Sequence, residues 1–235
     1  MAEALDLLMV VPARSGSKGL PDKNIRPLAG KPLLSWTAQT ITDAALPKAL
    51  AVLSTDSEQY AEIGRGSGLA VPFLRPACHA TDAASSLQVV EHAFDWFREH
   101  YAYLPAWVML LQPTSPFRSP AILRQAVAVV DGGKADAVIG CKEIQRNLTT
   151  LFQMSNGFMH ALDKRQPTQA SRQQSPPLLT PNGAMYLCRT DFLLMHKSFY
   201  PPHTVPLVMN TIQSLDIDTE DDWAIAEAFI KQGLV

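Results

Sequence analysis

The sequence is short of cysteine and has no cysteine pair of the kind that binds metal. Its three cysteines are widely spaced, at Cys78, Cys141 and Cys188. An odd number without a Cys-x-x-Cys pair argues against both a disulfide framework and a zinc site. We therefore expect three small, buried hydrophobic side chains in a protein of a reducing compartment.

An excess of one charge and long apolar runs are also missing. The chain has 20 Lys and Arg against 22 Asp and Glu, a net charge of −2. This balance argues against duplex nucleic acid or an anionic membrane as a partner, so phosphate binding requires a local pocket. The start of the chain has Glu3 and Asp6 but no basic region, and the apolar run 7–11 is too short to span a bilayer. We expect a soluble, cytoplasmic protein.

What the chain does have is a regular alternation of short apolar runs and amphipathic segments, within 235 residues of which 47% are hydrophobic. The run 5–11, which Pro12 ends, is typical of a parallel strand buried on both faces. Further strands are predicted at 49–53, 107–111, 135–141, 183–189 and 204–209, with a short extended piece at 71–74, and helices at 32–45, 57–68, 83–100, 120–130 and 220–231. This order predicts a single α/β domain over residues 1–235, a Rossmann-like doubly wound fold with a mostly parallel sheet.

Residues 142–181 interrupt the alternation. They consist of short amphipathic pieces and Gln-rich turns, punctuated by Gly157 and several prolines. Such a segment between two strands predicts an inserted arm or a small β-rich subdomain.

Ligands of doubly wound folds bind at the carboxyl ends of the strands, and residues 12–24 follow the first strand directly. Gly16 and Gly19 allow tight turns and a close approach of the backbone. Three cations lie in the same loop, at Arg14, Lys18 and Lys23. Backbone N–H groups and positive charge together suit a triphosphate. The motif is neither GxxxxGK[ST] nor GxGxxG, and its alternative is an ordinary surface loop.

An acidic segment covers residues 214–223. Asp216 and Asp218 are two positions apart, so in an extended stretch both carboxylates point the same way, with Ile217 towards the core. Hard oxygen ligands at this spacing suit a Mg²⁺ ion that bridges phosphates. Thr219 predicts a helix N-cap, and the three acids that follow it favour the positive end of that helix. Alternatively, all five acids are capping and solvated charge.

Three other segments offer polar groups. Residues 112–118 end a strand and can hold a polyhydroxylated ligand, or they form a simple proline turn. Residues 80–86 open a long helix with Asp82 as a natural N-cap, and the Ser86 hydroxyl on the first turn can meet a base or a phosphate. Arg172 is either a fork for a carboxylate or a surface arginine. The six histidines show no metal-binding spacing.

Four motifs, in this order, resemble those of the acylneuraminate cytidylyltransferases, the CMP-sialic acid synthetases. They are Pro-Ala-Arg-x-Gly-Ser-Lys-Gly-Leu-Pro-x-Lys-Asn at 12–24, Leu-Gln-Pro-Thr-Ser-Pro-x-Arg at 111–118, Pro-Asn-Gly-Ala-x-Tyr at 181–186 and Asp-Ile-Asp-Thr-Glu-x-Asp at 216–222. The similarity spans nearly the whole chain. It implies a nucleotide-diphospho-sugar transferase fold and a homodimer, in which residues 142–181 form a dimerisation arm that reaches the sugar pocket of the partner.

The resemblance also implies an activity, the transfer of CMP from CTP to the anomeric hydroxyl of an acidic nine-carbon sugar, with Mg²⁺ as the cofactor. The implied catalytic residues, the last two of which also bind the metal, are Arg14, Lys23, Asp216 and Asp218. The implied contacts of CTP are Ala13, Arg14, Ser17, Lys18, Lys23, Asn24, Arg75, Ala84 and Ser86. Those of the sugar are Gln112, Thr114, Ser115, Arg172, Asn182 and Tyr186.

Two positions depart from the sialic acid enzymes. Thr180 stands where an Arg precedes Pro-Asn-Gly, and Thr149 stands where a Lys is common. The sugar therefore stays open among N-acetylneuraminate and the legionaminic, pseudaminic and 3-deoxy-manno-octulosonic acids. A glycosyltransferase on the same fold and a non-catalytic protein that binds sugar nucleotides are further alternatives.

Overall fold

The computed structural model describes residues 6–17, 19–81, 83–101, 103–146, 148–162 and 177–235. The strands are β1 (Leu7–Pro12), β2 (Pro27–Leu28), β3 (Lys31–Pro32), β4 (Ala49–Ser54), β5 (Trp107–Leu110), β6 (Ala137–Ile144), β7 (Phe152–Ser155), β8 (Phe158–Ala161), β9 (Leu178–Arg189) and β10 (Thr204–Val208). The helices are α1 (Leu33–Ala44), α2 (Glu58–Gly66), α3 (Ser86–Tyr101), α4 (Pro120–Asp131), α5 (Thr190–His196) and α6 (Glu220–Lys231), with 3₁₀ turns η1 (Ala77–His79) and η2 (Leu148–Thr150).

The centre of the molecule is a sheet of the order β10-β6-β9-β5-β1-β4. β1 pairs in parallel with β4 and β5, and β10 pairs in parallel with β6. β9 is antiparallel to both of its neighbours, β5 and β6. The mostly parallel α/β sheet predicted from the sequence is confirmed.

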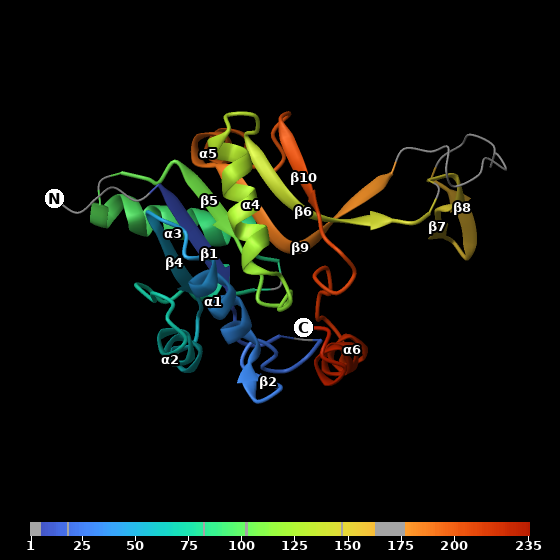
Figure 1. Cartoon of the computed structure of the whole chain (residues 1–235), viewed down its shortest axis with the longest axis horizontal. Helices are drawn as coiled ribbons and strands as arrows, with labels where there is room; N and C mark the ends of the chain where they lie inside the picture. Colours follow the sequence, from blue (N-terminus) through green and yellow to red (C-terminus); the bar gives the residue numbers. More distant parts are fainter. Residues whose placement is uncertain (1–5, 18, 82, 102, 147, 163–176) are drawn as a thin grey trace.

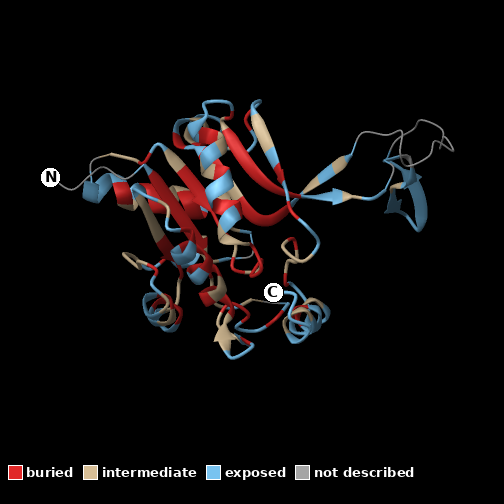
Figure 2. Ribbon diagram, in the orientation of Figure 1, coloured by how far each residue is buried: buried red, intermediate tan, exposed pale blue. Residues whose placement is uncertain are grey.

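Helices cover both faces of this sheet (Figures 1 and 2), and the side chains of β1 show how. Met9 and Val11 point into the core formed with α1 and α4, whereas Leu8 and Val10 point into the core formed with α3 and α5. All four side chains are buried. A strand buried on both faces needs a continuous apolar run, and this is why β1 could be located from its sequence.

An arm projects from the body, where β6 and β9 run on past the sheet and the hairpin β7–β8 lies beyond them (Figure 1). The sequence placed the start of β9 at Gly183, but the strand begins at Leu178, because pairing with β6 continues to Ile144↔Leu178. Pro181 is tolerated here since β5 ends at the level of Tyr186, so the proline removes no bond to a second neighbour.

Two further expectations need correction. The helix expected from residue 83 begins at Ser86, because the Ser85 hydroxyl accepts from the Gln88 N–H while the Gln88 side chain accepts from the Ser85 N–H. This reciprocal pair is a capping box, and the cap expected at Asp82 lies outside the described residues. Cys78, expected to be buried, is exposed because it lies on the surface turn η1.

Across the described parts of the chain, the helices are too short or too polar to cross a bilayer.

Candidate active site

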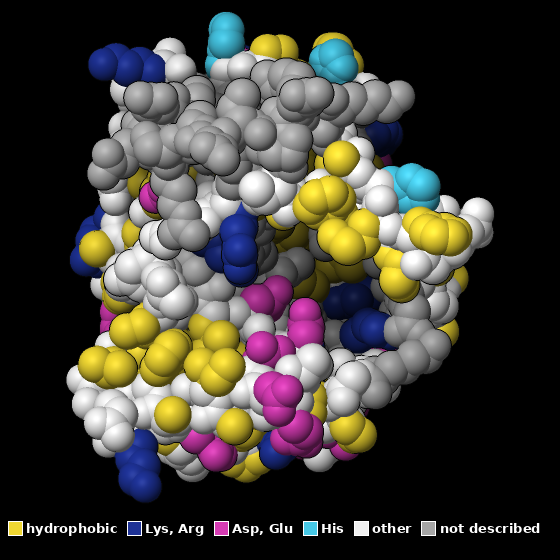
Figure 3. Space-filling model, turned by 90° about the vertical axis from the view of Figure 1, so that its right-hand side faces the viewer, with side chains coloured by type: hydrophobic (Ala, Val, Ile, Leu, Met, Phe, Trp, Pro, Cys, Tyr) yellow, Lys and Arg dark blue, Asp and Glu magenta, His cyan; other side chains and the backbone are white. Residues whose placement is uncertain are grey.

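A polar cavity of about 350 Å³ opens where β1 and β5 end. Figure 3 shows this face of the molecule hollowed, with Asp and Glu side chains gathered on one side of the hollow and Lys and Arg side chains on the other. The residues that line the cavity are Pro12, Arg14, Ser17, Lys23, Asn24, Arg75, Ala84, Ser86, Val89, Gln112, Pro113, Thr114, Asp216 and Asp218. Segments far apart in the sequence therefore meet at the sheet edge where a doubly wound fold binds its ligands.

The glycine loop after β1 is tied down by a carboxylate at the end of β4. Asp56 accepts hydrogen bonds from the Ser15 N–H at 2.8 Å and from the Ser15 hydroxyl at 2.7 Å. Burial raises the pKa of the Asp56 carboxyl, but these two bonds, a bond from its own backbone N–H and the charge of Arg75 together hold the pKa below its ordinary value. Gly16 then turns the chain with a φ of 70°, a left-handed conformation that glycine adopts without strain.

The loop and the acidic segment touch directly. The ammonium group of Lys23 donates to Asp218 Oδ1 at 2.7 Å, although Lys23 is only 7% exposed. The backbones also meet, because a Cβ atom placed on Gly19 would lie 2.8 Å from the Asp218 carbonyl oxygen. A residue without a side chain is therefore required at position 19 for the two segments to close together.

Asp216 and Asp218 line the same cavity, and Ile217 between them is fully buried. This is the alternation predicted for an extended stretch. The Ile217 N–H donates to the Thr114 carbonyl at 2.8 Å, which fixes the acidic segment against the loop after β5.

The Asp216 carboxylate lies in an unusual environment. Burial raises its pKa, and the negative charge of Asp218 acts in the same direction. The Thr114 hydroxyl and the charges of Lys23 and Arg118 lower it, but by less. Within the described chain, Asp216 Oδ1 is buried without a hydrogen-bond partner. Such an oxygen, next to a second carboxylate, fits a hard cation such as Mg²⁺.

The metal ligands available from the protein are few. Among the residues that the structure describes, no three His, Cys, Asp or Glu side chains gather into a metal site. Mg²⁺ bound by Asp216 and Asp218 would therefore take its remaining ligands from phosphates and water, as is usual for this ion.

Two arginines line the cavity, and both donate to the end of the turn η1 or to the residue that follows it. The Arg75 guanidinium donates to the Ser54 hydroxyl at 3.0 Å, to the Ser54 carbonyl and to the His79 carbonyl at 3.4 Å. Burial lowers the pKa of Arg75 to about 10, so the group stays charged at neutral pH. Arg14 donates to the Ala80 carbonyl at 3.5 Å. These contacts keep two positive charges on the wall of the cavity, which suits an anionic ligand such as a phosphate.

Gln112 and Thr114, both expected at the sugar, line the cavity. Gln112 packs closely against Gly183, where an added Cβ would lie 2.6 Å from Gln112 Oε1 and 3.3 Å from Asp216 Oδ2. The Asn-Gly turn of the third motif thus leaves room for two site side chains.

Four expected site residues do not line this cavity. Ala13 is fully buried, and its N–H donates to the Ser54 carbonyl. The Ser115 side chain is buried in the loop, and Asn182 is occupied by bonds to Ser214 Oγ at 3.0 Å and from the Ala184 N–H at 3.1 Å. Lys18 and Arg172 lie outside the described residues.

Tyr186, the fourth, packs among aromatic side chains. Its ring lies 5.6 Å from that of Phe199 and 6.5 Å from that of Tyr200. Burial, followed by the neighbouring Tyr200, raises the pKa of Tyr186 to about 12. The hydroxyl is therefore protonated at neutral pH and can donate a hydrogen bond.

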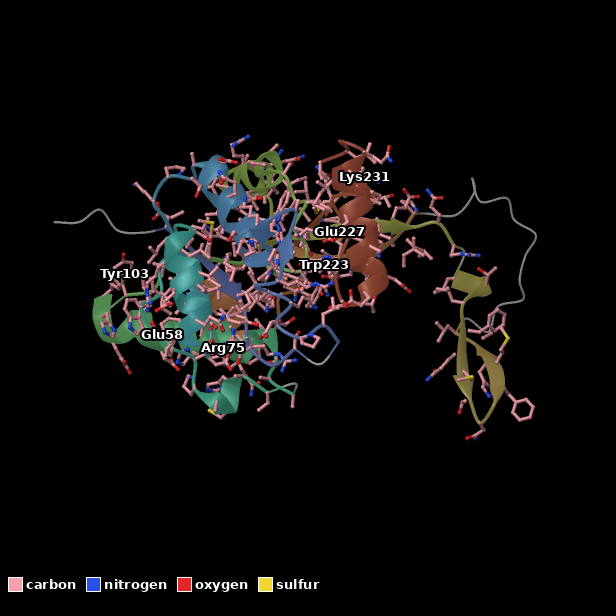
Figure 4. All side chains as sticks on the ribbon, turned by 90° about the horizontal axis from the view of Figure 1, so that it is seen from below. Glu58, Arg75, Tyr103, Trp223, Glu227 and Lys231 are labelled. Atoms are coloured by element: carbon pink, nitrogen blue, oxygen red, sulfur yellow. The ribbon has the colours of Figure 1, made fainter. Side chains whose placement is uncertain are left out.

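The acids that follow Asp218 have structural roles, as expected. Thr219 and Asp222 form a capping box at the start of α6. Glu220 accepts from Arg26 at 2.7 Å, and the Arg26 guanidinium lies 4.3 Å from the ring centre of Trp223. Figure 4 shows Trp223 in the first turns of α6, whereas Arg75 lies in another part of the view, near α2.

A second cavity, of about 810 Å³, shares Asp216 with the first. It lies between the base of the arm and the loop before α6. Its other lining residues are Lys142, Glu143, Gln145, Val208, Met209, Asn210, Thr211, Ser214, Leu215 and Asp222. The Asp216 carboxylate therefore lies at the boundary between the two cavities.

Sequence reasoning gave no role to Asp56 and counted Arg118 among the residues of 112–118 that can hold a ligand. Asp56 holds the glycine loop, and the only signal for it was its position at the end of a strand. Arg118 was visible as part of a motif, but nothing in the sequence showed that its side chain turns into the protein.

The α/β fold, the basic glycine loop and the paired carboxylates define the class of this protein, a nucleotidyltransferase. A family model described as "Cytidylyltransferase" matches residues 8–233. The chain therefore belongs to the cytidylyltransferase family, and the resemblance seen in its motifs is confirmed.

Individual relatives agree. The chain is 34% identical to the CMP-N,N'-diacetyllegionaminic acid synthase of Legionella pneumophila, over 96% of each chain. It is 33% identical to an N-acylneuraminate cytidylyltransferase of Streptococcus agalactiae, of which it spans 51% of the length and 92% of its own. A structure of CMP:2-keto-3-deoxy-manno-octonic acid synthetase complexed with CTP has the same fold, with a TM-score of 0.69 at 15% identity over 97% of this chain and 99% of that one.

Proposed function

We propose that the protein transfers CMP from CTP to the anomeric hydroxyl of a nonulosonic acid, with release of pyrophosphate. The observation that carries the proposal is the meeting of Lys23 with Asp218 in a cavity that Asp216 also lines. The names of the two relatives, both of which match at least 92% of this chain, support the same chemistry.

The residues of the chain position the reactants and neutralise charge. Arg14, Lys23 and Arg75 hold the phosphates, while Asn24, Ala84 and Ser86 border the space for the nucleoside. The sugar hydroxyl attacks the α-phosphorus in line, the bond from the α-phosphorus to the bridging oxygen breaks with pyrophosphate as the leaving group, and the hydroxyl proton passes to water. Pyrophosphate leaves along the cationic loop.

Asp216 and Asp218 would hold Mg²⁺, which when bound neutralises charge on the phosphate oxygens. The buried, unpartnered Oδ1 of Asp216 supports this assignment. The raised pKa of Asp216 supports the same assignment, because a buried carboxylate that binds a cation is poorly stabilised when the cation is absent.

The second cavity is our candidate for the acceptor sugar. It borders Asp216, so a sugar there lies next to the phosphates. Lys142 can pair with a sugar carboxylate, and Asn210 and Thr211 can bond hydroxyl groups. Lys142 brings positive charge to a lining that also holds Glu143 and Asp222, so an acidic, polyhydroxylated sugar fits with its carboxylate towards Lys142.

The test is pyrophosphate release from CTP and Mg²⁺ with a panel of keto sugar acids that includes legionaminic, N-acetylneuraminic, pseudaminic and 3-deoxy-manno-octulosonic acids. Since one relative acts in the legionaminic series, that series should give the highest kcat/KM. Absence of release with every acid would remove the proposed activity, whereas a different order within the panel would change only the sugar.

The arm is our candidate for a dimer contact. Phe152, Met154 and Met159 share one face of the hairpin β7–β8, and all three are exposed, Met154 by 80%. A two-stranded hairpin with an uncovered apolar face is only marginally stable alone, and a second copy of this chain would cover it. Light scattering should give the mass of a dimer for the wild type and a lower mass for Met154→Ser combined with Met159→Ser. A monomeric wild type would contradict this assembly.

We also place the activity in the cytoplasm, because that compartment supplies CTP.

A further inference from the structure

Arg118 ends the loop that brings Gln112 and Thr114 into the nucleotide cavity, but it does not line that cavity itself. It is 2% exposed. Its guanidinium donates to the Thr37 hydroxyl at 2.8 Å and to the Gln112 carbonyl. Its own carbonyl accepts from the Thr40 hydroxyl at 3.2 Å. The side chain and the backbone of Arg118 are thus both bonded to α1, and the bond from its side chain to Gln112 links the two ends of loop 112–118.

This closed loop carries the acidic segment. The Thr114 carbonyl accepts the Ile217 N–H at 2.8 Å, and Ile217 separates the two site carboxylates in sequence. The Thr114 hydroxyl and the Arg118 charge both act on the Asp216 carboxyl. A short chain of contacts therefore leads from a side chain outside the cavity to the carboxylate inside it.

Burying a charged guanidinium costs folding free energy, and the Arg118 guanidinium does not make all of its hydrogen bonds among the described residues. Burial lowers the pKa of Arg118 to about 9, and its Nε has no hydrogen-bond partner within the described chain. A buried charge of this kind contributes little to stability. Buried charges with unmade hydrogen bonds are found mainly at functional sites.

We propose that Arg118 is a positioning residue for the transfer. Its fork fixes loop 112–118 and, through Thr114, the acidic segment, so that Asp216 keeps its place between the cavity of the nucleotide and that of the acceptor. The inference rests on the proposed function. The planar fork is essential to it, because a single ammonium group reaches only one of the two oxygens that Arg118 binds.

The test compares Arg118→Lys and Arg118→Met in the full chain. Arg124→Met is the matched control, because Arg124 is exposed on the neighbouring helix α4 and donates to the Asp43 carbonyl at 3.0 Å. Arg118→Met should lower kcat about 100-fold while the KM for CTP stays within about 3-fold. Arg118→Lys should recover about 10-fold of that loss. Arg124→Met should match the wild type.

A folded Arg118→Met enzyme with the kcat of the wild type would overturn the inference, and so would a variant in which only thermal stability and the KM for CTP change. Should neither variant fold, Thr37→Val removes one acceptor of the fork and should lower kcat about 10-fold; an unchanged kcat would overturn the inference equally. A wild type that releases no pyrophosphate overturns the proposed function and this inference together, whereas the variant outcomes affect the inference alone.

Discussion

The Lys23 ammonium group lies 2.7 Å from Asp218 Oδ1, across 195 positions of sequence. The pair joins the cationic loop to the acidic segment. In it, Lys23 and Asp218 neutralise each other, whereas with ligands bound Lys23 would face a phosphate and Asp218 the metal cation. Lys23 is nearly buried, whereas the Asp218 side chain is 68% exposed. On binding of Mg²⁺ and CTP we expect the pair to separate, with the carboxylate turned to the metal and the ammonium group to a phosphate.

Replacing Lys23 therefore should weaken nucleotide binding more than it destabilises the fold. Lys23→Met is expected to raise the KM for CTP about 10- to 100-fold, since one charge-assisted phosphate contact is lost. Steady-state kinetics check this, with Lys134→Met as the control, because Lys134 is exposed and lies outside the cavity. A KM for CTP equal to that of the wild type would remove Lys23 from the phosphate site.

Asp216→Asn should make the metal-free protein more stable and the enzyme nearly inactive. The pKa of Asp216 is raised in the folded state above its ordinary 3.8, so ionisation at neutral pH costs folding free energy that an amide does not cost. The gain in Tm, measured with a chelator present, should vanish as the pH falls below about 4, where the carboxyl is protonated in both states.

Turnover of Asp216→Asn should fall at least about 100-fold. Asp221→Asn is the matched control, since Asp221 is exposed at the start of the same helix α6, and it should change neither turnover nor Tm in this way. A lower Tm at pH 7 for Asp216→Asn would show that the carboxylate stabilises the fold instead.

Gly19→Ala should impair the enzyme through a backbone clash. The new methyl group would lie 2.8 Å from the Asp218 carbonyl oxygen, so the acidic segment must move. We expect kcat to fall at least about 10-fold. Gly66→Ala is the control, because a Cβ there meets nothing within 4 Å and it should leave activity unchanged. Wild-type kcat in Gly19→Ala would mean that the two segments need not approach so closely.

Asp56→Asn should loosen the glycine loop. The folded pKa of Asp56 is depressed, so its contribution to stability is complete above the unfolded value of about 3.9 and is lost as the pH falls through the folded value. At pH 7 the variant should lose about 1–3 kcal/mol of unfolding free energy, as expected for hydrogen bonds to a charged group, and this difference should shrink below pH 4. Urea unfolding at both pH values measures it, with the exposed Asp95→Asn as the control. An equal loss at both pH values would contradict the role of the charge.

The sequence predicted those parts of the fold whose signal is local. β1 and α6 were located because a run buried on both faces and a capped amphipathic helix are both visible in a short window. The early start of β9 was missed, because it depends on pairing with β6 beyond the edge of the sheet. The exposure of Cys78 likewise depends on where the turn η1 lies in the folded chain.

The candidate site could be predicted to a similar degree. The loop at Lys23 was found because it directly follows a buried strand, and Asp216 and Asp218 were found because a spacing of two residues in an extended stretch points both carboxylates the same way. The inward turn of the Arg118 side chain and the occupied bonds of Asn182 could not be found, since a motif gives the residue type but not the partner that its side chain reaches.

The fate of the α-phosphate of CTP tests the central claim most directly. With α-labelled CTP, Mg²⁺ and a nonulosonic acid, the wild type should transfer the label into a CMP-sugar at the same rate at which pyrophosphate appears. A label that stays in CTP, or that is released as free CMP without forming a sugar product, would contradict the account.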